Sequence, residues 1–176
     1  MLLDEPSRPW TRRERTLALW LHRGAARPAL VSVLLATSRL GDGWLWYALI
    51  ATLPWWGGAS GPKCALYMLA LGAVNLVFYK ALKQRIARPR PYVSCPGIRA
   101  CARSLDEFSF PSGHTMHAVA FSLVLAHYHP ALAWPLWTFT ALVALSRVVL
   151  GLHYPSDVAI GALIGGLTAG FMLVIV

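Results

Sequence analysis

Residues 157–176 read DVAIGALIGGLTAGFMLVIV, and no charged residue follows Asp157 in this stretch. About 20 mainly apolar residues are enough for a helix to cross the hydrocarbon core of a bilayer, which is about 30 Å thick. A helix in a soluble bundle needs one polar face, and this stretch has almost none. It therefore predicts a membrane-spanning helix.

Similar apolar stretches lie upstream, separated by segments rich in Gly or Pro. The first two are short for spans, whereas the third and fifth show almost no polar face. Together with the last stretch they predict an all-α fold, a polytopic membrane helical bundle of about six transmembrane helices over residues 28–176, preceded by an N-terminal segment, 1–27, with an amphipathic part. The upstream stretches are 28–40, 44–56, 64–82, 112–128 and 131–150, and the breakers include Gly41-Asp42-Gly43, the Pro-rich stretch 88–111, Pro130 and Pro155.

The composition agrees with a membrane protein. The chain is 57% hydrophobic and 13% charged, whereas a soluble domain averages about 25% charged residues. The net charge of +9 is compatible with nucleic acid, an anionic lipid surface or an anionic substrate as partner. Nucleic-acid binding needs a basic face on a soluble module, for which the apolar stretches leave little room. We therefore expect membrane lipids and an anionic substrate as partners, and no nucleic acid.

The basic residues also give an expected orientation. Six arginines precede the first apolar stretch, which favours a cytoplasmic N-terminus, and six crossings would return the C-terminus to the same side. The loop 83–111 would then lie outside although it is basic, which is explained if its cations bind an anion. We expect an integral protein of a bacterial inner (plasma) membrane, with both termini cytoplasmic and the active site at the periplasmic, outer face. The six arginines are Arg8, Arg12, Arg13, Arg15, Arg23 and Arg27.

The first of three polar motifs is Lys83-x6-Arg90-Pro91, at the end of the third stretch. Lysine supplies a mobile point charge, and arginine supplies a planar fork that can grip two phosphate oxygens. Taken alone, the motif is a weak signal, because a basic cluster at the end of a membrane helix is more often an anchor among lipid headgroups.

The second motif, Pro111-Ser112-Gly113-His114, opens the fourth stretch. Ser112 is suited to the N-cap position. The unpaired N–H groups of the following first turn would face an incoming anion. Gly113 would let a phosphate approach the backbone, and His114 could protonate a leaving oxygen.

The third motif is Ser146-Arg147-x5-His153-x3-Asp157. An arginine inside an apolar stretch usually marks a functional site or a partner. Asp157 could hold one imidazole nitrogen of His153 and leave the other free to attack, as in catalytic triads. A buried Arg147–Asp157 ion pair is the alternative.

With all three motifs in this order, the chain resembles the type 2 phosphatidic acid phosphatase family, within the wider superfamily of acid phosphatases and vanadium haloperoxidases. The resemblance implies a phosphohistidine intermediate on His153, with Asp157 as its orienting group and His114 as the acid and base. It further implies neither metal nor other cofactor. The phosphate-binding residues that it implies are Lys83, Arg90, Ser112, Gly113 and Arg147.

The resulting functional hypothesis is an integral membrane lipid phosphatase. Undecaprenyl pyrophosphate, phosphatidylglycerol phosphate, phosphatidic acid and a lipid A phosphate are all candidate substrates, and the sequence does not choose among them. A lipid-to-lipid phosphotransferase and a non-catalytic lipid-binding protein are the alternatives.

Four further expectations concern residues outside the motifs. We expect a disulfide between Cys95 and Cys101 if the loop faces an oxidising compartment, and a packing or rim position for His117. Asp106 and Glu107 are interpreted as residues that solubilise the loop. The small-residue spacing of Gly161, Gly165, Gly166 and Gly170 suits close helix packing within the bundle.

Overall fold

The computed structural model describes residues 9–175, and every regular element in that range is helical. Several helices begin at a proline, whose missing N–H and fixed φ suit the first turn. The α-helices are α1 (Pro9–His22), α2 (Pro28–Arg39), α3 (Leu45–Trp56), α4 (Gly61–Ile86), α5 (Pro91–Ser94), α6 (Gly113–Tyr128), α7 (Ala133–Val149) and α8 (Pro155–Val174).

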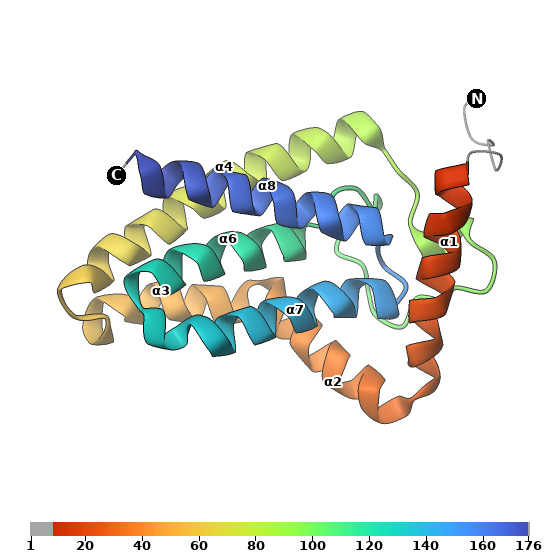
Figure 1. Cartoon of the computed structure of the whole chain (residues 1–176), viewed down its shortest axis with the longest axis horizontal. Coiled ribbons are helices and arrows are strands. Elements are labelled where there is room, and N and C mark those ends of the chain that lie inside the picture. Colours follow the sequence, from red (N-terminus) through yellow and green to blue (C-terminus); the bar gives the residue numbers. More distant parts are fainter. Residues whose placement is uncertain (1–8, 176) are drawn as a thin grey trace.

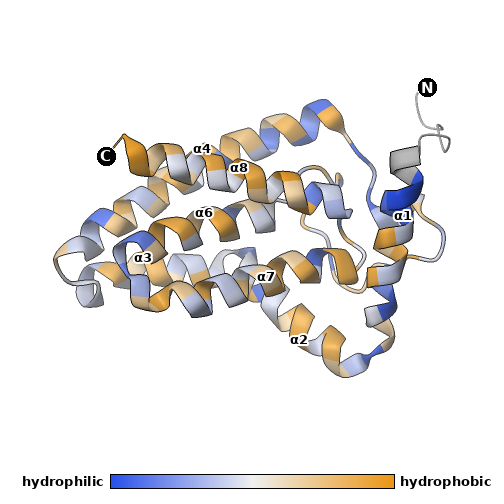
Figure 2. Ribbon diagram, viewed as in Figure 1, coloured by the Kyte–Doolittle hydropathy of each residue, from blue (hydrophilic) through white to orange (hydrophobic). Residues whose placement is uncertain are grey.

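The bundle is built around α6, which packs against α4, α7 and α8 (Figure 1). Its core contains the fully buried Met68 and Val124, and Trp46 packs against Phe121 in a tilted arrangement with 5.3 Å between ring centroids. Many large apolar side chains are exposed, and hydrophobic residues occur along the helices of the bundle (Figure 2). Three stretches, Gly58–Ser94, Pro130–Val149 and Pro155–Val174, are long and apolar enough to cross a membrane. The predicted membrane helical bundle is confirmed.

Helices α6 and α8 approach most closely at two glycines. A Cβ atom at Gly161 would lie 2.5 Å from the carbonyl oxygen of Ser112, and one at Gly165 would lie 2.2 Å from that of Met116. The predicted role in packing within the bundle is therefore confirmed for Gly161 and Gly165, whereas a Cβ atom at Gly166 or Gly170 would meet almost nothing.

The first two predicted segments need a correction, because they do not form a hairpin. Residues 40–44 form a π-helical turn with a kink at Gly43 (φ 129°), and α2 and α3 continue in the same general direction on either side of it (Figure 1). Helix α2 packs on α7, whereas α3 packs on α4. Each has 12 residues, about 18 Å of helix, which is too short for a bilayer core. Together they make one bent segment, and the expected number of about six crossings stays a prediction.

Helix α1 lies across the end of the bundle at which α6 and α8 begin (Figure 1). Its last residue, His22, is buried, and Nδ1 of its ring lies 2.8 Å from the carbonyl oxygen of Val149. The amide of Arg99 donates to Nε2 of the same ring at 3.2 Å. Residues 9–27 of the predicted N-terminal segment therefore pack on the bundle, while residues 1–8, Arg8 among them, lie outside the described residues. The last turn of α8 lies at the opposite end from α1.

Candidate active site

The three motifs meet at the end of the bundle covered by α1. The guanidinium of Arg90 donates to the carbonyl oxygen of Leu152 at 2.7 Å, which ties the first motif to the third. The amide of Ser112 donates to the carbonyl oxygen of Asp157 at 3.0 Å, which ties the second motif to the third. The expected convergence of the motifs on one face is thus observed.

The two cations of the first motif share one carboxylate, that of Asp106. Lys83 and Arg90 are both buried. Nη2 of Arg90 lies 2.8 Å from Oδ1 of Asp106, and Lys83 and Tyr79 donate to the same carboxylate. Burial alone would raise the pKa of Asp106, but the hydrogen bonds from Lys83 and Tyr79 and the nearby positive charges outweigh it, so that the pKa is lowered.

The interpretation of Asp106 as a solubilising residue is therefore wrong. Its carboxylate is the shared counter-charge of Lys83 and Arg90. The sequence offered one usable signal, an acid within a basic loop, but not the distance that makes it part of the site.

Arg147 reaches the same region from the last turn of α7. It is 2% exposed, and Nη1 donates to the hydroxyl of Ser38 on α2 at 2.6 Å. Its buried Nε has no acceptor among the described residues. The alternative of a buried ion pair between Arg147 and Asp157 is not observed there, because Asp157 pairs with Arg88 instead.

His153 lies in the turn between α7 and α8, buried beside Asp157. Its Nε2 is 3.3 Å from Nη1 of Arg90. Because a guanidinium only donates, Nε2 must accept, which places the imidazole proton on Nδ1. Nδ1 lies 3.7 Å from Oδ2 of Asp157, near the carboxylate but beyond hydrogen-bonding distance. Burial, followed by the positive charges of Arg147, Arg90 and Lys83, holds the pKa of His153 well below its ordinary value, so the ring is neutral.

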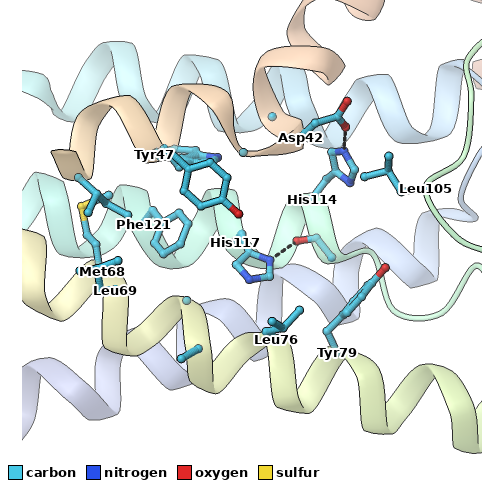
Figure 3. A pocket seen from close by; sticks show the side chains of 17 residues that line it. Asp42, Tyr47, Met68, Leu69, Leu76, Tyr79, Leu105, His114, His117 and Phe121 are labelled. Atoms are coloured by element: carbon cyan, nitrogen blue, oxygen red, sulfur yellow. Dashed lines mark hydrogen bonds and ion pairs between the residues drawn. The ribbon is translucent and has the colours of Figure 1, made fainter. Parts of the chain in front are cut away.

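The second motif places His114 in the first turn of α6. Its Nε2 is hydrogen-bonded to Asp42, which comes from the kink between α2 and α3 (Figure 3). Ser112 is the N-cap residue, as predicted, but its hydroxyl pairs with that of Thr115 at 3.0 Å. Gly113 is buried as the first residue of the helix.

A cavity of about 370 Å³ extends from His114 between α3, α4 and α6 (Figure 3). Its walls are mostly apolar, and its polar groups, among them Asp42 and Tyr79, gather near His114. His117 lines it as well and lies on the rim side of α6, in agreement with the prediction. The apolar wall includes Trp46, Tyr47, Ile50, Met68, Leu69, Leu76 and Phe121.

The predicted disulfide is absent, since Cys95 and Cys101 are both free thiols. Cys95 packs with Ala18 and Tyr154, whereas Cys101 packs beside Leu150, in a different apolar cluster. The two side chains are therefore held apart by their packing. Among residues 9–175 no group of three or more His, Cys, Asp or Glu side chains lies together as a metal site would require, and the metal-free mechanism remains a prediction.

Comparison with known proteins gives consistent results. Undecaprenyl-diphosphatase BcrC of Bacillus subtilis is 34% identical over 127 residues, 72% of this chain and 65% of the relative, so the match spans just under two thirds of BcrC. Decaprenylphosphoryl-5-phosphoribose phosphatase of Mycobacterium tuberculosis is 32% identical over 146 residues, 79% of this chain and 76% of the relative.

Two solved structures share the fold. LpxE of Aquifex aeolicus matches with a TM-score of 0.80 at 25% identity and covers 90% of this chain and 93% of its own. A transmembrane PAP2-type phosphatidylglycerolphosphate phosphatase of Bacillus subtilis matches with a TM-score of 0.71 at 24% identity, over 94% and 85% of the two chains. The model of the PAP2 superfamily matches residues 63–176, the part that carries all three motifs. The chain therefore belongs to the PAP2 superfamily.

Proposed function

We propose that the protein is a membrane lipid phosphatase that hydrolyses a prenyl or glycerolipid phosphate through a phosphohistidine at Nε2 of His153. The observation that carries the proposal is the state of this ring. Its Nε2 lies 3.3 Å from Nη1 of Arg90, which leaves the imidazole proton on Nδ1, and Nδ1 faces Oδ2 of Asp157 at 3.7 Å. A nucleophilic imidazole needs this tautomer, with a carboxylate behind it.

The reaction follows from the positions of the groups. Nε2 of His153 forms a bond to phosphorus as the bond to the lipid oxygen breaks, and His114 gives the leaving oxygen a proton. Water then attacks phosphorus, its proton passes to His114, and the P–N bond breaks to release phosphate. Lys83, Arg90 and Arg147 balance the charge on the phosphoryl oxygens, together with the hydroxyl of Ser112 and the N–H of Gly113. Such positioning and charge stabilisation supply most of the catalysis in phosphoryl transfer.

The cavity supports a lipid as substrate. Its apolar walls begin at His114, between helices of the bundle, so that a chain in it would hold its phosphate at the polar end. The names of the relatives indicate polyprenyl pyrophosphate or phosphate esters as the first substrates to test.

The protein is integral to a membrane, and we propose that the site opens at its outer face. The structure pairs Lys83 and Arg90 with Asp106, and Arg88 with Asp157, which lessens the conflict with the positive-inside rule. Helix α1 lies at the site end of the bundle and the last turn of α8 at the opposite end (Figure 1), so with the site at the outer face the last turn of α8 would lie on the cytoplasmic side. The expectation that both termini are cytoplasmic stays a prediction.

Labelling of Cys101 tests this orientation, because it is a partly exposed thiol at the site end. A membrane-impermeant maleimide should label it in intact spheroplasts, with Cys101→Ser as the control. Labelling only after permeabilisation would place the site in the cytoplasm.

The activity is tested by phosphate release from lipid phosphates in detergent and EDTA. We expect His153→Asn to abolish release and His127→Asn, an exposed histidine near the other end of α6, to leave it unchanged. Release that survives in His153→Asn would overturn the proposal. Phosphate recovered on an added lipid acceptor rather than in solution would identify a phosphotransferase, and no turnover of any lipid would favour a lipid-binding protein.

A further inference from the structure

Helix α1 contributes one carboxylate to the site end of the bundle, that of Glu14. Oε2 lies 2.6 Å from Nη2 of Arg88. Oε1 accepts from the backbone N–H of Ser156 at 3.1 Å and also from its hydroxyl. Glu14 thus connects α1 both to the loop after α4 and to the first turn of α8.

Arg88 continues the chain of contacts inward. Its Nη1 donates to Oδ1 of Asp157 at 2.7 Å and to the hydroxyl of Ser156 at 2.7 Å. The guanidinium also lies over the ring of Tyr154, 4.1 Å from its centroid. The side chain is therefore fixed on three sides, by two carboxylates and an aromatic face.

Asp157 is fully buried, and a buried carboxylate needs both a counter-charge and hydrogen bonds. Oδ1 receives Arg88, and Oδ2 receives the N–H of Tyr154 at 2.8 Å. It is Oδ2 that faces Nδ1 of His153 at 3.7 Å. The bond on Oδ1 consequently fixes the plane of the carboxylate that stands behind the nucleophile.

We propose that Glu14 and Arg88 are positioning residues that hold the carboxylate of Asp157 in place beside Nδ1 of His153. Helix α1, which carries Glu14, is thereby part of the catalytic unit. The inference rests on the proposed function. Glu14 keeps the outer end of the guanidinium in place, so that the inner end stays on Asp157. Neither residue contacts the reacting atoms, and their loss should slow the chemical step while the cations of the phosphate site remain.

The test compares kcat and KM of the purified full-length protein for farnesyl pyrophosphate in detergent micelles. We expect Arg88→Gln to lower kcat about 10- to 100-fold, with KM within about twofold, because misplacement of a catalytic group by about 1 Å costs on the order of 10²-fold. Glu14→Gln should lower kcat less, by about 3- to 10-fold. Arg88→Lys should recover part of the loss. The double variant should be no slower than Arg88→Gln alone, since Glu14 acts through Arg88.

Arg85→Gln is the control for Arg88→Gln, and Glu107→Gln is the control for Glu14→Gln. Each control removes an exposed charge of the same sign as the residue under test, in or next to the loop after α4. Both should keep the wild-type kcat. Thermal unfolding of every variant separates loss of the fold from loss of positioning. If Arg88→Gln does not fold, the kcat of the milder variant Glu14→Gln still tests the proposal.

The two proposals fail in different ways. If wild-type protein releases no phosphate, or His153→Asn releases it normally, the proposed function is wrong. If His153→Asn is inactive while Arg88→Gln and Glu14→Gln keep the wild-type kcat, only the positioning inference is wrong. Losses in kcat that add fully in the double variant would also overturn it.

Discussion

Replacing Gly165 by alanine would place a methyl group where α6 and α8 leave no room for one. The new Cβ atom would lie 2.2 Å from the carbonyl oxygen of Met116, and ordinary contact begins at 3.4 Å. The obstacle is backbone and cannot rotate away, so the two helices must separate by about 1 Å. Overpacking of this kind destabilises by about 1–3 kcal/mol.

The separation should affect activity more than stability, because the two helices carry opposite halves of the site. Helix α6 holds His114, and α8 holds Asp157. A displacement of about 1 Å can lower the rate on the order of 10²-fold. We therefore expect Gly165→Ala to lose about that factor in kcat, and Gly161→Ala, which meets Ser112 itself at 2.5 Å, to lose at least as much.

The same helix provides matched controls. A Cβ atom at Gly166 meets only a side-chain atom of Val119 at 4.0 Å, and one at Gly170 meets nothing within 4 Å. Alanine at either position should leave kcat unchanged and raise stability by up to about 1 kcal/mol through helix propensity. Phosphate release and thermal unfolding in detergent measure both effects. If Gly165→Ala matches Gly166→Ala in rate and melting temperature, the close-approach argument is refuted.

Three further predictions concern the charged groups of the site. Asp42→Asn should lower kcat about tenfold, because His114 loses the carboxylate bonded to its ring and placed imidazoles contribute about 10²–10⁴-fold; an unchanged rate would contradict this. Asp106→Asn leaves two buried cations without their shared carboxylate and should destabilise the protein by about 3–5 kcal/mol, as measured by thermal or denaturant unfolding. The lowered pKa of His153 means that the unfolded state binds more protons below about pH 6.5. Stability should therefore fall with decreasing pH in that range, by at most about 1.4 kcal/mol per pH unit from this group, and His153→Asn should remove this contribution.

Most of the bundle could be predicted from the sequence, because a helix that crosses a lipid bilayer needs a long and mainly apolar stretch of residues. Apolar stretches bounded by Pro or Gly became α4, α6, α7 and α8 close to their expected limits. The segment Gly41-Asp42-Gly43 was interpreted as a break between two membrane segments, although two glycines permit a reversal or a kink equally well. The packing of α2 on α7 decides between them, and that contact is not encoded locally.

The site was predicted as far as its motifs extend. Motif spacing identified the histidines and cations, but it contains no information about which acid neutralises which base. Glu14 and Arg88 are 74 positions apart, and Arg88 looked like one of many loop cations. The amphipathic pattern of α1 likewise predicted a helix but not its place across the site.

The distribution of acidic residues has a consequence for mutational tolerance. Of the seven acidic residues in the chain, four are held in contacts at the site: Glu14, Asp42, Asp106 and Asp157. Among the sixteen basic residues, by contrast, several arginines of α1 and of the loop after α4 are exposed, so that their substitution should have little effect. In a scan of all single substitutions, these four acidic positions should therefore be intolerant, whereas the exposed basic positions should accept change.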